Sequence, residues 1–325
     1  MRKLAVVAFA TGLAGAVALV VWFGAGAIAS AVAGLGWLGF LVVCLAHAPV
    51  AALLGAGWRV CFAPAAQISL PSVIWARVLR DAGAEVLPFS EIGGFVIGAR
   101  AAIMAGVSTV DAAASTLADL TTEAVAQIVF IALGLIAVVD MRPGAAIVRP
   151  TLFGLVAVAG IGVALAISLQ PGHRLSRLGA AAARRWLAGF GDVDKALAAL
   201  REIGARRIAV VASLSLHLLA WLAVAVEAWL ALRLIGAPIS LESAVAMESL
   251  LFASRSLAFL APNGLGVQEG AYALLAPLVG LAPADALALS LIKRARDLAI
   301  GAPALLIWQR LEAAQAWRGG AGPAP

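Results

Sequence analysis

Acidic and amide side chains occur at helical spacing inside one long apolar segment of the sequence. Asp119, Glu123 and Gln127 are four residues apart and therefore share one face of a helix predicted over Thr116–Val139. Charged groups inside an apolar segment are costly unless they pair, bind a polar ligand or carry protons. The spacing therefore predicts a buried polar site on this face of the helix.

Charged residues also occur inside apolar segments elsewhere in the chain. Lys293, Arg296 and Asp297 share one face of the last apolar segment, Asp285–Trp308. Three more candidates lie in shorter segments: Arg100, Arg255 and Glu269. Because ionisable groups at such positions are functional by default, each is a candidate binding residue.

Two interpretations of these charges are open. In the first, the charges only pair with one another and hold helices together, for example Asp119 or Glu123 with Lys293 or Arg296. In the second, the two charged faces form one central site. Asp111 and Asp285 are set apart because each stands at a predicted helix start, where capping explains an acidic residue.

The elements that must position these charges are membrane helices. Hydrophobic residues make up 63% of the 325-residue chain and charged residues 12%, and no charged residue lies between Lys3 and Arg59. A run of that length can hold two spans of ~20 residues each. We expect an all-α, polytopic membrane protein with about 6–8 membrane segments. Residues 1–318 would form one membrane domain, followed by a disordered tail, 319–325.

Hydropathy, together with the prolines, glycines and charged residues at segment ends, divides the membrane domain into segments. The first is expected to be a retained span and not a cleaved signal peptide, and Pro49 is expected to kink the second. The predicted spans are Leu4–Phe23, Trp37–Trp58, Thr116–Val139, Thr151–Leu169, Ile208–Ile235 and Asp285–Trp308. Between them lie two short apolar arms, Ile92–Val107 and Leu265–Leu281, and an amphipathic helix over Ser69–Glu85, at the interface or inside the protein.

The distribution of basic residues predicts the orientation. The one clearly polar region, residues 170–207, holds eight Lys or Arg against three acids, and Leu197, Leu200 and Ile203 form a helical stripe in it. Cytoplasmic loops carry such an excess of basic residues, so this loop and both termini are expected on the cytoplasmic side of a bacterial inner membrane. The loop either lies on the anionic leaflet or is simply solvated. The net charge of +6 is thereby explained without nucleic-acid binding.

The chain contains a weak internal repeat. A shift of 174 residues places Pro88 on Pro262, Gly106 on Gly280 and Glu123 on Asp297. The order of features is the same in both copies: a proline turn, a short apolar arm, a glycine, an acidic helix start and a long span. The predicted orientation inverts one copy, about 66–139, relative to the other, about 240–308. Inverted repeats with broken or re-entrant helical hairpins are typical of secondary transporters.

The segment Pro262-Asn263-Gly264-Leu265-Gly266-Val267-Gln268-Glu269 resembles the P-x-G-x-G-x-x-E signature of the flippase-like membrane family, the transmembrane region of lysylphosphatidylglycerol synthases. The resemblance covers about Trp37 to Trp308. The stretch from Leu87 to Gly94 looks most like the subgroup encoded with hopanoid-lipid biosynthesis (HpnL-like). The soluble aminoacyl-transferase domain of the synthases is not expected in this chain, so lysine transfer is not expected either.

The resemblance implies a transporter or handler of a polar-headed lipid that is linked to hopanoid biosynthesis, with membrane lipids (phospholipid, isoprenoid or hopanoid) as partners. It adds Pro262, Gly264 and Gly266 to the candidate site and includes Glu269. Arg255, Lys293 and Arg296 would neutralise an anionic headgroup, while Asp119, Glu123 and Asp297 would pair with them or carry protons. The alternative is a non-transporting accessory subunit or scaffold for lipid-biosynthesis enzymes. No enzymatic activity, catalytic residue, cofactor or metal site is expected, because no reactive constellation occurs in the sequence.

Overall fold

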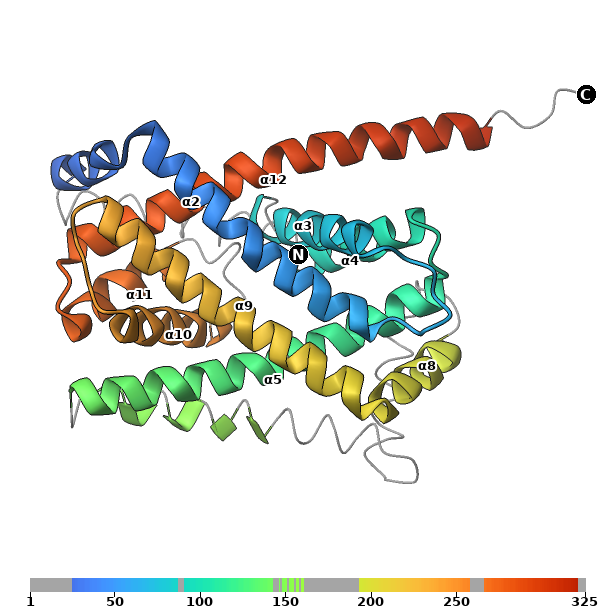
Figure 1. The fold of residues 1–325 in the computed structure, drawn as a ribbon, viewed down its shortest axis with the longest axis horizontal. Coiled ribbons are helices and arrows are strands. Elements are labelled where there is room, and N and C mark those ends of the chain that lie inside the picture. The colour runs from blue at the N-terminus through green and yellow to red at the C-terminus, as the bar shows by residue number, and fades with distance from the viewer. Residues whose placement is uncertain are drawn as a thin grey trace, which may run out of the picture.

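The computed structural model describes residues 25–86, 91–142, 193–257 and 266–320, with part of 146–160. Within these ranges the regular secondary structure is entirely helical (Figure 1). Three of the described helices are long and apolar enough to cross a bilayer: Ala33–Cys61 within α2, Thr109–Met141 (α5) and Arg207–Leu234 (α9). The all-α membrane class is therefore confirmed. The predicted first span and most of Thr151–Leu169 lie outside the described residues.

Helix α2, Ala25–Cys61, has non-helical backbone angles at one position. Pro49 lies inside the helix, and the residue with non-helical backbone angles is Gly36, at φ 59°. A positive φ is open to glycine at no steric cost. The kink at Gly36 therefore falls just before the predicted span Trp37–Trp58, and the kink expected at Pro49 stays a prediction.

Two helix pairs lie on opposite sides of the bundle (Figure 1). One is α3 (Leu70–Val86) with α4 (Glu91–Met104), and the other is α10 (Leu241–Leu257) with α11 (Val267–Leu275), which continues as the 3₁₀ turn η2 (Ala276–Val279). The short arms thus begin and end close to their predicted bounds. The turns of both pairs, including Pro262 and Gly264, lie outside the described residues.

Each helix pair leads into a long helix through a left-handed glycine. Gly106, at φ 98°, precedes α5, and Gly280, at φ 74°, precedes α12 (Pro283–Gly320). These two glycines are the pair that the repeat places on each other. Asp111 lies in the first turn of α5, where Ser108 caps the helix by accepting from the Asp111 N–H. Helix α12 includes the first two residues of the predicted tail.

The long helices and the helix pairs pack crosswise. Helix α3 packs on α12, whereas α10 packs on α5, and α2 and α9 pack along each other between them (Figure 1). The closest approaches use small residues: a Cβ on Gly134 of α5 would lie 1.5 Å from the Ser249 hydroxyl of α10. Such close contacts are typical of helix packing inside membranes. The crosswise order brings α3, α5, α9 and α12 around one interior.

Most of the described part of the predicted polar loop forms helix α8, Val193–Ala205. Its apolar stripe is turned into the protein, because Leu197 and Ile203 are buried and α8 packs on α5 and α9. The stripe was predicted correctly. Within the described residues its apolar face is covered by neighbouring helices, and residues 170–192 lie outside them.

Candidate functional site

Two arginines of α3 and two acids of α5 form a buried ion-pair cluster. Arg77 donates to both carboxylate oxygens of Glu123, at 2.7 and 3.0 Å. Arg80 donates to Asp119 at 2.6 Å and to Glu123 at 2.8 Å. All four side chains are buried. Each buried arginine thus faces a carboxylate of α5, which is what makes burying these charges tolerable.

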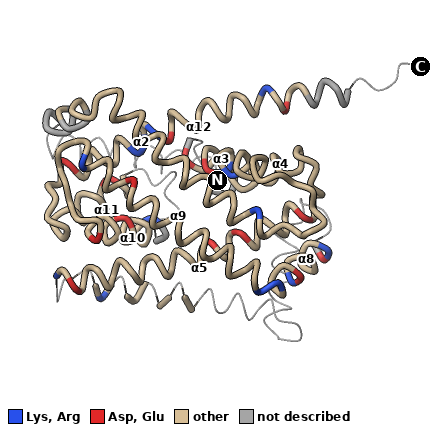
Figure 2. The backbone as a smooth tube through the Cα atoms, in the orientation of Figure 1, with Lys and Arg blue, Asp and Glu red and all other residues tan. Residues whose placement is uncertain are grey.

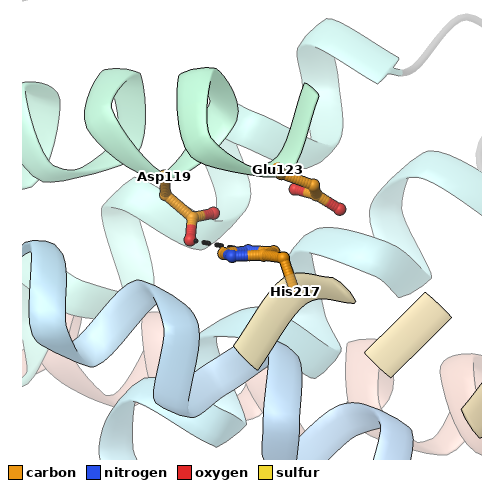
Figure 3. A group of neighbouring side chains, drawn as sticks. All are labelled: Asp119, Glu123 and His217. Atoms are coloured by element: carbon orange, nitrogen blue, oxygen red, sulfur yellow. Dashed lines mark ion pairs between the residues drawn. The ribbon is translucent and has the colours of Figure 1, made fainter. Parts of the chain in front are cut away.

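A histidine from α9 completes this first cluster (Figure 3). The Nε2 atom of His217 lies 3.2 Å from Oδ1 of Asp119, and its Nδ1 lies 2.8 Å from the Ser213 carbonyl oxygen. Ser213 also shares a hydrogen bond of 2.8 Å with Thr122 of α5. The cluster therefore ties α3, α5 and α9 together.

The carboxylates and the imidazole of the first cluster are the described groups best arranged to hold a metal ion. Ligand atoms of Asp119, Glu123 and His217 lie within 4.8 Å of one another (Figure 3). The guanidinium groups of Arg77 and Arg80 already bind the same carboxylates, so an added cation would face two positive charges at close range. The geometry favours an ion-pair cluster over a metal site, and the expected absence of a metal stays a prediction.

The predicted partners of the α5 acids were wrong. Asp119 and Glu123 do not pair with Lys293 or Arg296 but with arginines of the segment Ser69–Glu85. The sequence left open whether that segment lies at the interface or inside the protein. With Arg77 and Arg80 at 3–4% exposure, it lies inside.

Lys293 belongs to a second buried cluster, around Glu248 of α10. The Lys293 ammonium donates to Glu248 at 2.6 Å, and the Tyr272 hydroxyl of α11 donates to the other oxygen of Glu248, also at 2.6 Å. Glu248 is fully buried. It was not among the predicted site residues, although an acid in the middle of the mostly apolar sequence of α10 was the signal that could have found it.

Glu269 of the family signature holds the start of α11. One carboxylate oxygen accepts from the Gly266 N–H at 2.8 Å, where Gly266 has φ 79°, and the other accepts from Arg294 at 2.5 Å. Arg294 was not among the predicted site residues. The two signature residues that the structure describes, Gly266 and Glu269, thus fix the helix start against α12.

The remaining bases of the candidate list pair with acids from other helices. Arg296 contacts Glu227 of α9 and its neighbour Asp297, the latter at 2.6 Å. Nδ1 of His47 on α2 lies 2.9 Å from the other carboxylate oxygen of Glu227. Arg255 donates to Glu85 of α3 at 2.8 Å. Arg255, Arg296 and Asp297 therefore lie together around the junction of α2, α3, α9, α10 and α12.

Arg100 is the described candidate that lies apart. It is on the outer face of α4, 46% exposed, and pairs with Glu312 near the end of α12 at 2.7 Å. Its predicted membership of a central site is therefore not supported by its position. The exposed ion pair joins α4 to α12.

A cavity of ≈ 290 Å³ lies between α2, α3 and α12, at the meeting point of these charged groups. Its polar lining is Cys44, His47, Asp81, Glu85 and Asp297, and its other lining residues are apolar or small. We call it the central cavity. Each of its carboxylates forms an ion pair with an arginine: Asp81 with Arg77, Glu85 with Arg255 and Asp297 with Arg296. Asp81 and Glu85 were not predicted.

Figure 2 shows the charged residues gathered inside the body of the helices as well as at their ends. Apolar spans, short paired helices and charges neutralised in the interior together define a helical membrane protein with a polar core. A family model described as the lysylphosphatidylglycerol synthase transmembrane region matches residues 5–304. The chain belongs to this family, which places it in the biology of membrane lipids. No curated protein and no solved structure gives a significant match.

Proposed function

We propose that this protein is a flippase-like transporter that moves a polar-headed lipid across a bacterial inner membrane, and that the central cavity receives the headgroup. The observation that carries the proposal is the cavity itself: three carboxylates and a histidine line a space of ≈ 290 Å³ inside an apolar bundle. Polar groups at that depth are costly to maintain and are typical of substrate pathways.

The charge arrangement around the cavity suits a polar ligand. The carboxylates of Asp81 and Asp297 are 38% and 24% exposed, while their partners Arg77 and Arg296 are 4% and 6% exposed. The carboxylates thus face the cavity, and the arginines that pair with them are more deeply buried. A headgroup with an ammonium can bind the exposed carboxylates while their arginines stay in place, whereas a phosphate has to compete with the carboxylates for the arginines.

The architecture supports alternating access by inverted halves. The α3–α4 pair and the α10–α11 pair have the same order of elements, end at matched left-handed glycines and pack crosswise on the long helix of the other half. Paired short helices of this kind let non-helical backbone lie within a membrane protein. Rocking of the halves would open the central cavity to one side at a time.

The experiment is a lipid-flipping assay with the full-length protein in liposomes. Fluorescent phospholipid, isoprenoid and hopanoid lipids are offered, and the fraction that changes leaflet is measured by quenching from outside. We expect movement with the wild type, and at least tenfold slower movement with Asp81→Asn or Asp297→Asn. Both variants leave their arginines partnered, Arg77 by Glu123 and Arg296 by Glu227, so folding is expected to persist.

A matched control is Glu242→Gln, which removes an acid from the exposed start of α10. It is expected to flip lipid at the wild-type rate. Wild-type protein that moves none of the lipids, also when offered an extract of native lipids, would refute transport and favour the accessory-subunit alternative. Faster movement of hopanoid lipids than of the others would support the link to hopanoid biosynthesis.

A further inference from the structure

A second cavity lies at one end of the bundle, where α2 finishes and α9 begins. It has a volume of ≈ 710 Å³ and is lined by the end of α2 with the residues after it and by the junction of α8 and α9. Its charged lining residues are Arg59, Arg206 and Arg207. We call it the basic cavity. Arg59 is 12 residues beyond His47 on α2, or ~18 Å along the helix, so the basic cavity is distinct from the central cavity.

The three arginines are not neutralised by acids of the described chain. Arg59 and Arg207 make no ion pair with any residue that the structure describes, and no carboxylate is among the described lining residues. Acids do occur on the neighbouring helix α8, as Asp194 and Glu202, but they do not line the cavity. Figure 2 shows the basic residues where α8 meets α9.

One of the three arginines builds the wall of the cavity. Arg206 donates to the carbonyl oxygen of Phe62 at 2.8 Å and to that of Val60 at 3.4 Å. These carbonyls belong to the end of α2, where backbone acceptors have no partner within the helix. Arg206 thus holds the ends of α2 and α9 together, and Arg59 and Arg207 are left to meet a ligand.

The remaining lining is apolar and continues onto the outside of the bundle. Val60, Phe62, Pro64 and Ile208 contribute to the cavity, and Ile208 is 88% exposed. One turn further along α9, Val211 is also exposed. A ligand that fits must carry negative charge at one end and hydrocarbon beside it. Guanidinium groups bind phosphate oxygens in a bidentate manner, and ends of membrane helices meet lipid headgroups.

We infer that the basic cavity binds an anionic phospholipid, with its phosphate between Arg59 and Arg207 and its acyl chains along Ile208 and Val211. This lipid would be a bound component that joins α2 to α9, and the inference does not depend on lipid transport. A free phosphate shares the charged part of this chemistry but lacks the hydrocarbon. The apolar wall therefore favours the lipid.

The test uses the purified full-length protein in detergent and measures the thermal midpoint as phosphatidylglycerol, phosphatidylcholine or inorganic phosphate is added. We expect phosphatidylglycerol to raise the midpoint at lower concentration than phosphatidylcholine, and phosphate to have little effect. The double variant Arg59→Gln, Arg207→Gln is expected to bind phosphatidylglycerol ~30-fold more weakly, since each arginine near a lipid surface contributes about fivefold in affinity. Arg206 is kept because it supports the helix ends.

Arg310→Gln is the matched control, because it removes one positive charge from an exposed position on α12 away from the cavity. It is expected to keep the wild-type response. Equal shifts with phosphatidylglycerol and phosphatidylcholine, or an undiminished response in the double variant, would overturn the inference. An equal shift with inorganic phosphate would assign the site to a free anion instead. Should the double variant not fold, native mass spectrometry of the wild type decides: retention of phosphatidylcholine as readily as phosphatidylglycerol would contradict the site.

Discussion

Replacing Lys293 by methionine should destabilise the protein strongly, because it leaves a buried carboxylate without its cation. Lys293 and Glu248 are 7% and 0% exposed, and their charged atoms are 2.6 Å apart. Tyr272 holds one oxygen of Glu248, so the variant would leave the other oxygen bare. Breaking a buried pair on one side costs ~3–5 kcal/mol, or roughly 150- to 4,000-fold in the unfolding equilibrium.

The measurement is thermal unfolding of the purified protein in one fixed detergent, followed by tryptophan fluorescence. Arg100→Met is the comparison, because the Arg100–Glu312 pair is almost as short, at 2.7 Å, but its side chains are 46% and 33% exposed. Exposed pairs contribute at most about 1 kcal/mol. If burial decides the effect, Lys293→Met lowers the midpoint far more than Arg100→Met. Equal midpoints for the two variants would refute this reasoning.

The double variant Lys293→Met, Glu248→Gln separates structure from substrate binding. It removes both charges and keeps an oxygen that can accept from the Tyr272 hydroxyl. Recovery of stability together with lipid flipping would mean that the pair is structural. Recovery of stability without flipping would mean that Lys293 acts on the substrate, as the sequence interpretation proposed.

Two further predictions concern packing and orientation. Gly134→Ala should lower the free energy of unfolding by ~1–3 kcal/mol, because its Cβ would overlap the Ser249 side chain of α10. Gly204→Ala on α8 should be neutral, because no atom lies within 4 Å of the added Cβ. Equal thermal midpoints for the two variants would contradict the close contact. In an Arg185→Cys variant, the new thiol should not react with membrane-impermeant reagents added from the periplasmic side and should react after permeabilisation, because basic loops face the cytoplasm. Labelling of this thiol in intact cells would overturn the predicted orientation.

Local patterns in the sequence predicted the helices well. The amphipathic segment Ser69–Glu85 became α3 at Leu70–Val86, and Ile208–Ile235 became α9 at Arg207–Leu234. These bounds follow from where apolar runs meet charges and glycines, which is information within each segment. The kink at Gly36 was not singled out from the sequence, because proline and glycine both allow a bend and the neighbouring helices decide where one forms.

The candidate site was predicted less well, because pairing depends on packing between distant segments. The burial of Asp119 and Glu123 followed from their spacing, and the structure confirms it. Their partners are 39 to 46 residues away on α3, and no local pattern identifies which cation meets which acid. Glu85 and Asp81 gained importance only when the fold brought α3 beside α12 and formed the central cavity.

The contact between Glu227 and Arg296 has a consequence for how the chain is made. Arg296 follows Glu227 by 69 residues, which corresponds to roughly 3–14 seconds of synthesis at about 5–20 residues per second. During that interval α9 carries an acid whose arginine does not yet exist. His47, made 180 residues earlier, is already present and lies 2.9 Å from Glu227 in the finished protein. His47 can therefore hold Glu227 in place until α12 arrives and completes the pair.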